Sequence, residues 1–321
     1  MRTKLLLILI LLTACSEVVK PCNICGGGTG DIVVLALDGR ALVNLGLSYD
    51  SYLGSWDQNG VWRESTYKKD QARFSLAFAY RLSKHLQFGV SLPYVMNFHN
   101  VPGLKQNGAG IGDIYVAGRY EFFHEFQVKK KNNKSRVDNV LPYLAVTFGI
   151  TVPTGKSDEN AQSEADVTGK GYYMSSLGIS VTKSLIKNRL QVSTDFSWQH
   201  CFKKTYEKYF GEQTPEYTKD PGDKFNYSLS FNYIFNNWHA VSLSTSGFSQ
   251  TAYHINSTIG QNSNEHNLNF IFAYTYYPIV PLRITPSVKW TIPGDNFGKN
   301  ASASTTFNLN VTYYFADYNI K

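Results

Sequence analysis

The feature that most constrains this chain is a repeating alternation of apolar and polar residues, clearest between residues 108 and 156. There GAGIGDIYVAGRYEFF is followed, after a basic connection, by LPYLAVTFGITVPTGK. In the first segment Tyr120 and Phe122 alternate with Arg119 and Glu121. A period of two is typical of a β-strand with one apolar face. Because the opposite face carries glycines and charges, we expect one face to meet lipid and the other to meet water.

The same alternation recurs to the end of the chain and predicts about twelve strands, each near the roughly 9 to 11 residues that cross a bilayer with tilt. No apolar run after the N-terminus approaches the ~20 residues of a membrane-spanning helix. The chain is therefore predicted to be an all-β, antiparallel transmembrane β-barrel. A soluble β-sandwich, the alternative, would bury the aromatic faces against a second sheet. The first predicted strand starts at Ala41, and the others cover 71–82, 86–94, 111–122, 141–153, 172–183, 189–201, 225–235, 238–248, 268–276, 282–292 and 305–315.

Long and short connections alternate between the predicted strands. In such barrels the long loops lie outside the cell and the short turns lie in the periplasm, so both ends of the chain are expected in the periplasm. The basic connection, Lys129 to Arg136, is the one exception and is interpreted as a solvated segment. Residues 203–223 are predicted to be a long charged loop with two prolines.

The N-terminus has the pattern of an export signal. Arg2 and Lys4 precede an apolar stretch over residues 5–12, which predicts a signal peptide over residues 1–14. Leu12, Thr13, Ala14 and Cys15 resemble the lipobox of bacterial lipoproteins. That resemblance implies that Cys15 is lipidated and becomes the first residue of the mature protein. An ordinary signal peptide with a chance cysteine is the alternative.

Residues 15–40 are predicted to form a lipid-anchored periplasmic tail or a plug segment ahead of a barrel over residues 41–315, with a short periplasmic tail at 316–321. Cys22 and Cys25 form a CxxC in this segment. In an oxidising compartment the pair predicts a small disulfide loop. A soft-metal site is the other interpretation, although two thiolates need further ligands, which the neighbouring sequence does not supply.

The alternation also predicts which charged side chains point into the lumen. Two interpretations stay open: the charges pair with one another across a closed interior, or they line a narrow, basic-leaning conduit that selects permeants by sign. The predicted lumen-facing residues are Arg73, Arg81, Asp113, Arg119, Glu121, Asp195, Arg283 and Lys289.

No motif predicts an enzyme. VPTGKS at residues 152–157 lacks the glycine that a P-loop requires five residues before Gly155, where Ile150 stands. No cofactor is predicted. The net charge of +7 would suit nucleic acid, but an export signal excludes that partner. The expected partners are outer-membrane lipid, a small-molecule permeant and, during biogenesis, the barrel-assembly machinery.

GIGDIYVAGRY followed by VTFGITVPTGKS, between Gly110 and Ser157, resembles the bacterial outer-membrane transporter family linked to phenol meta-pathway degradation. The resemblance implies a porin-like channel or transporter for small molecules in the outer membrane. The alternative function is a structural or interaction barrel whose CxxC tail handles metal or redox partners in the periplasm.

Overall fold

The structure is a computed structural model that describes residue 35 and residues 39–123, 128–131, 134–137, 142–186 and 189–316. The predicted signal peptide, Cys15, Cys22 and Cys25 lie outside the described residues, as do residues 317–321. Among the described residues, no helix is long and apolar enough to cross a membrane.

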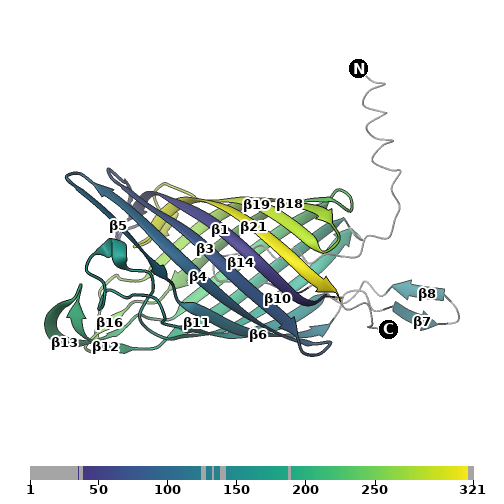
Figure 1. The fold of residues 1–321 in the computed structure, drawn as a ribbon, viewed down its shortest axis with the longest axis horizontal. Coiled ribbons are helices and arrows are strands. Elements are labelled where there is room, and N and C mark those ends of the chain that lie inside the picture. The colour runs from purple at the N-terminus through teal and green to yellow at the C-terminus, as the bar shows by residue number, and fades with distance from the viewer. Residues whose placement is uncertain are drawn as a thin grey trace, which may run out of the picture.

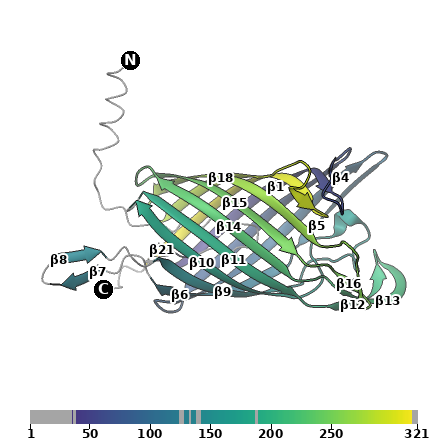
Figure 2. The same cartoon turned by 180° about the vertical axis from the view of Figure 1, so that it is seen from behind.

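Twelve long strands form one closed antiparallel barrel, which confirms the predicted fold (Figures 1 and 2). Each strand pairs with the next barrel strand along the chain, and the last pairs with the first. The barrel strands are β1 (Gly39–Trp56), β3 (Lys68–Arg81), β4 (Leu86–Val101), β6 (Ile114–Phe123), β9 (Tyr143–Val152), β10 (Met174–Ile186), β11 (Leu190–Cys201), β14 (Lys224–Ile234), β15 (His239–Gln250), β18 (Glu265–Ile279), β19 (Leu282–Thr291) and β21 (Ser302–Ala316).

The two ends of the barrel differ in their connections. At the short-turn end the chain turns over within a few residues, as between Arg81 and Leu86, and the strand ends Gly39 and Ala316 meet there. The basic connection carries the hairpin β7 (Val128–Lys131) and β8 (Lys134–Val137), which projects from this end (Figure 1). The long-loop end carries β2 (Trp62–Glu64), β5 (Leu104–Ile111), η1 (Glu164–Asp166), β12 (Lys204–Tyr209), β13 (Glu212–Asp220), β16 (His254–Ile255), β17 (Thr258–Ile259) and β20 (Gly298–Lys299).

The structure corrects two details of the predicted elements. Residues 203–223 are not a plain loop, because β12 and β13 form a hairpin in which Tyr206 and Tyr217 stack with ring centroids 5.3 Å apart. Cross-strand aromatic pairs stabilise such hairpins, and this pair was hidden among charged neighbours. The predicted strand 111–122 is also broken, since β5 ends at Ile111 and β6 begins at Ile114.

The outer wall of the barrel is apolar and the inner wall is polar. On β3 the side chains of Phe74, Leu76 and Phe78 are exposed, whereas Ala77 and Ala79 on the opposite face are buried. A soluble protein would bury the large residues, so this wall suits a lipid solvent. The buried side chains of the inner wall include Asn44, Gln87, Arg119, Glu121, Gln191, Asn232, Thr275, Thr306 and Thr312.

Candidate permeation pathway

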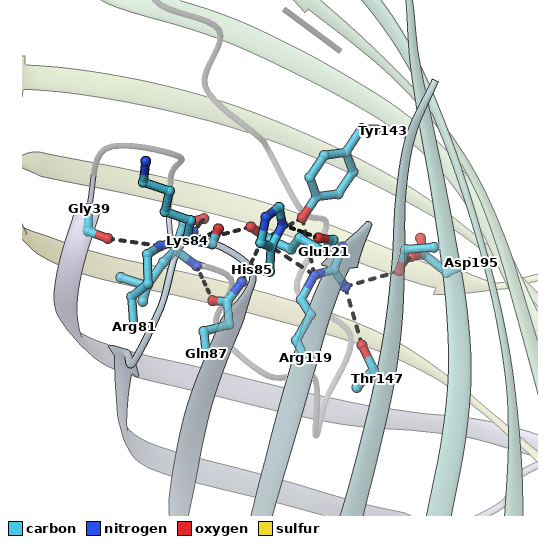
Figure 3. Close-up of polar contacts among 12 residues, drawn as sticks. Gly39, Arg81, Lys84, His85, Gln87, Arg119, Glu121, Tyr143, Thr147 and Asp195 are labelled. Carbon is cyan, nitrogen blue, oxygen red and sulfur yellow. Dashed lines mark hydrogen bonds and ion pairs between the residues drawn. The ribbon is translucent and has the colours of Figure 1, made fainter. Parts of the chain in front are cut away.

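At the short-turn end, one side of the inner wall carries a group of paired polar side chains, which we call the Glu121 cluster: Arg81, Gln87, Arg119, Glu121 and Tyr143 (Figure 3). The Glu121 carboxylate accepts hydrogen bonds from Arg81 Nη1 at 2.8 Å, Gln87 Nε2 at 2.6 Å and the Tyr143 hydroxyl at 2.5 Å. Arg119 Nε lies 3.9 Å from the same carboxylate. The cluster therefore neutralises and hydrogen-bonds its buried charge, as burial requires.

Arg119 connects this cluster to the neighbouring wall. Its Nη1 donates to Thr147 Oγ1 at 3.3 Å and to Ser180 Oγ at 3.1 Å. Ser180 in turn donates to Asp195 Oδ1 at 2.5 Å, and Ser228 donates to Asp195 Oδ2 at 3.0 Å. The polar network thus runs around the inner wall from β6 to β14, and Figure 3 shows its course as far as Asp195.

Leu35, the one described residue ahead of β1, lies inside the barrel at this end. Its backbone nitrogen donates to Gln87 Oε1 at 2.9 Å, and its carbonyl accepts from Arg81 Nη2 at 3.4 Å. Its side chain is fully buried against Leu42 and Ala79. Two of the residues that bind Glu121, Arg81 and Gln87, therefore also bind Leu35, which precedes the barrel.

At the long-loop end, residues 157–170, here called the cap loop, fold onto the inner wall of β4 and β5. The buried Asn97 amide donates to the carbonyls of Ala165 and Val167, both at 2.8 Å. Gly108 lies directly beneath Ala165, where a Cβ would overlap the carbonyl oxygen. The glycines of the GAGIGD motif therefore make room for the cap loop.

Asp113 fixes the root of the cap loop. It lies between β5 and β6, and its carboxylate accepts hydrogen bonds from the backbone nitrogens of Gly155 at 3.0 Å and Lys170 at 2.7 Å. A Cβ on Gly155 would lie 2.7 Å from the Gly169 Cα. The GIGD and PTGK motifs thus form one structural unit, in which Asp113 binds backbone amides.

The β12–β13 hairpin packs beside the cap loop and lines with it an open cavity of about 260 Å³. Lys204 Nζ forms an ion pair with Glu159 at 2.7 Å, and the Phe210 backbone nitrogen donates to the Asp158 carbonyl at 2.7 Å. Burial is the main cause that raises the pKa of the Tyr206 hydroxyl above its ordinary value. The cavity is lined by Asp158, Val167, Gly169, Lys170, Tyr172, Tyr206 and Lys219.

The rest of the inner wall carries further charged side chains. Lys289 on β19 and Lys224 on β14 are half-buried, and the Lys224 ammonium lies 3.8 Å from the centroid of the Phe248 ring. Arg73 Nη2 donates to Gln71 at 2.5 Å. Near the short-turn end, the Arg283 guanidinium stacks over Tyr314, 5.3 Å from its centroid.

Sequence reasoning missed several residues of this pathway. Lys224 and Glu265 continue the inward series of β14 and β18, but both lie ahead of the strands predicted at 225–235 and 268–276. Gln87, Asn97 and Tyr143 carry no formal charge, so charge alone could not reveal them. Among the described residues, no group of three or more His, Cys, Asp or Glu side chains could hold a metal ion.

A closed barrel of twelve antiparallel strands, apolar outside and polar inside, defines a class of protein: the outer-membrane β-barrel. The chain belongs to the family described as putative MetA-pathway of phenol degradation, which matches residues 82–307. This match confirms the family resemblance predicted from the GIGD and PTGK motifs.

An outer-membrane channel from Pseudomonas putida shares the fold over 90% of this chain and 100% of its own, with a TM-score of 0.69 and 14% sequence identity. The translocator domain of the autotransporter NalP from Neisseria meningitidis aligns over 86% of this chain and 88% of its own, with a TM-score of 0.48 and 8% identity. The first similarity shows a common barrel, and the second is too distant to carry an argument. A comparison with curated proteins found no match.

Proposed function

We propose that this outer-membrane barrel is a channel or transporter that passes small molecules through its lumen. One observation carries the proposal: a closed barrel whose inner wall is lined with polar and charged side chains. Such a wall would be unnecessary in a barrel that only filled its interior with apolar packing. Arg73, Arg81, Arg119, Glu121, Asp195, Arg283 and Lys289 are the predicted lumen residues that we assign to this wall, while Asp113 holds the cap loop.

Side chains and a loop obstruct part of the lumen at both ends of the barrel, which favours small permeants. The Glu121 cluster and Leu35 occupy the short-turn end, and the cap loop covers part of the wall at the long-loop end. A permeant must pass both regions, so we propose that passage is narrow and that the segment ahead of β1 restricts it.

Single-channel recording of the purified protein in planar bilayers tests this function. We expect small discrete openings from the full chain and larger ones from a variant that lacks residues 16–38, since that deletion removes Leu35 from the lumen. A silent full chain together with a silent deletion variant would contradict the proposal, provided that both migrate as folded, heat-modifiable barrels.

We also propose that Cys15 carries lipid that tethers the N-terminal tail to the outer membrane. The lipobox-like sequence from Leu12 to Cys15 supports this, and two or more acyl chains give stable anchoring where one gives only marginal binding. Intact-mass analysis should show the added mass of acyl chains in the wild type and its loss in Cys15→Ala. A mature N-terminus of the same mass in both, apart from the substitution, would remove the idea.

For Cys22 and Cys25 we propose a disulfide in the same tail, because exported cysteines meet an oxidising compartment. Labelling of the exported protein with a maleimide reagent should require prior reduction. Equal labelling with and without reductant would argue for free thiols.

A further inference from the structure

The unpaired lysines of the inner wall near the long-loop end point to a binding role. Lys224 and Lys289 project from β14 and β19, and Lys170 comes from the cap loop. No carboxylate of the described residues lies within ion-pair distance of any of the three ammonium groups. An ammonium has three hydrogen-bond donors, so each of these groups has donors to offer to a ligand.

The three ammonium groups share one region of the lumen. Lys170 and Lys289 both repel the Lys224 charge, whereas Glu265 attracts it. Lys289 is attracted by the charge of Asp50 and repelled by that of Arg73. The carboxylates nearby are Glu265 and Asp50, two acids against the four bases Lys170, Lys224, Lys289 and Arg73. Positive charge is therefore in excess at this level.

An apolar surface lies directly beside this excess charge. The Lys224 ammonium lies over the Phe248 ring, and Phe248 packs against a cluster formed by Trp56, Ala301 and Ala303, with Leu53 and Trp62 around it. A cation over an aromatic face is held in place without losing its charge. The lumen thus offers a fixed positive group next to an aromatic wall.

We propose that Lys224, with Lys170 and Lys289, forms a binding site for organic anions that pair one carboxylate with an apolar body. The carboxylate accepts charge-assisted hydrogen bonds from the lysines, and the apolar body packs along Phe248. Like charges gathered in a half-buried wall are unfavourable until an anion enters, which favours occupancy by such a ligand. This inference rests on the proposed channel function, because the ligand reaches the site through the lumen.

Benzoate, compared with the neutral benzyl alcohol, is the probe. The full chain in lipid nanodiscs is dialysed to equilibrium against labelled benzoate, and Lys224→Gln is compared with Lys105→Gln, which changes an exposed lysine of the β4–β5 hairpin. We expect Lys224→Gln to weaken benzoate binding at least about tenfold, as the loss of one charge-assisted hydrogen bond implies. Lys105→Gln should bind benzoate like the wild type, and benzyl alcohol should bind more weakly than benzoate.

Two results would overturn the site. Equal benzoate affinity in the wild type and in Lys224→Gln would show that the lysine does not contact the anion. Displacement of benzoate by chloride at similar concentrations, with no binding of benzyl alcohol, would reduce the site to one for inorganic anions. Binding is measured without conduction, so benzoate binding in a protein that is silent in bilayers would refute the channel and leave the site standing.

Discussion

The two charged regions of the lumen are built from the same inward-facing positions of the strands but treat charge in opposite ways. At the short-turn end, Glu121 is fully buried and bonded to Arg81, Gln87 and Tyr143. Near the long-loop end, Lys224 lies over the Phe248 ring and forms no ion pair with a described residue. A charge whose partners are supplied by the chain stabilises a closed interior, whereas a charge without a partner is available to a ligand.

The residue types follow this division. The short-turn end uses arginine, whose planar guanidinium can bind a carboxylate and carbonyl oxygens at once, as Arg81 does with Glu121 and the Gly39 carbonyl. Lysine is a flexible point charge that adapts to an incoming anion. The comparison predicts that substitutions at the two regions separate effects on stability from effects on binding.

The largest effect is expected from Glu121→Ala. It leaves Arg81 and Arg119 buried without their carboxylate, and breaking a buried ion pair in this way costs about 3 to 5 kcal/mol. Glu265→Ala is the control at the other region and should cost less than about 1 kcal/mol, because Glu265 forms no ion pair among the described residues. Urea unfolding in lipid vesicles, followed by heat-modifiable gel mobility, measures both. Equal losses of unfolding free energy in the two variants would contradict the proposed difference between the two regions.

The next largest effect is expected on the outer wall of the barrel. Phe270 is exposed on the outer face, so Phe270→Arg should cost about 2 to 4 kcal/mol, as expected for a charge that faces the middle of the bilayer. Asn269 is a poor inward control because it is buried and hydrogen-bonded to Thr291. Its cross-strand neighbour Ser246 is better, and Ser246→Arg should fold nearly normally. A larger loss of unfolding free energy in Ser246→Arg than in Phe270→Arg would contradict the assignment of the outer and inner faces.

A smaller effect is expected where the cap loop rests on β5. Gly108→Ala places a methyl group against the Ala165 carbonyl and should destabilise the cap loop by about 1 to 3 kcal/mol, the usual cost of overpacking. Single-channel conductance should rise as the cap loop is displaced. Gly110→Ala is the matched control, since its Cβ would lie 3.4 Å from Thr168, an ordinary contact. A rise in both variants, or in neither, would mean that the cap loop does not limit passage.

The smallest effect concerns pH. Burial raises the pKa of Tyr206 in the closed cap region, while an opened loop lets it ionise near its usual value of about 10. The contribution of this residue to closure is therefore complete below pH ~10 and is lost as the pH rises above it. Conductance should stay level below pH ~10 and increase as the pH rises above it, and Tyr206→Phe should reduce that increase. The same increase in conductance in Tyr206→Phe as in the wild type would show that another group titrates.

Sequence alone predicted the barrel because a period of two is a local signal that each strand carries in full. It could not predict which inward charges pair, because pairing depends on strands that are not adjacent. Arg81 on β3 and Glu121 on β6 are separated by β4, so their 2.8 Å contact follows from the closed curvature of the barrel. The role of Asp113 was likewise hidden, since its two partners, Gly155 and Lys170, lie 42 and 57 residues further along the chain.

The seam between β1 and β21 joins Gly39 to Ala316 and so links the first described strand to the last. A ribosome or an export channel delivers these strands far apart in time. Until the last strand arrives, β1 and β19 both present open hydrogen-bonding edges, which are a template for aggregation. Contacts of such long sequence separation also form slowly. The final fifteen residues of the described chain are therefore the ones that end the period in which the nascent protein needs protection.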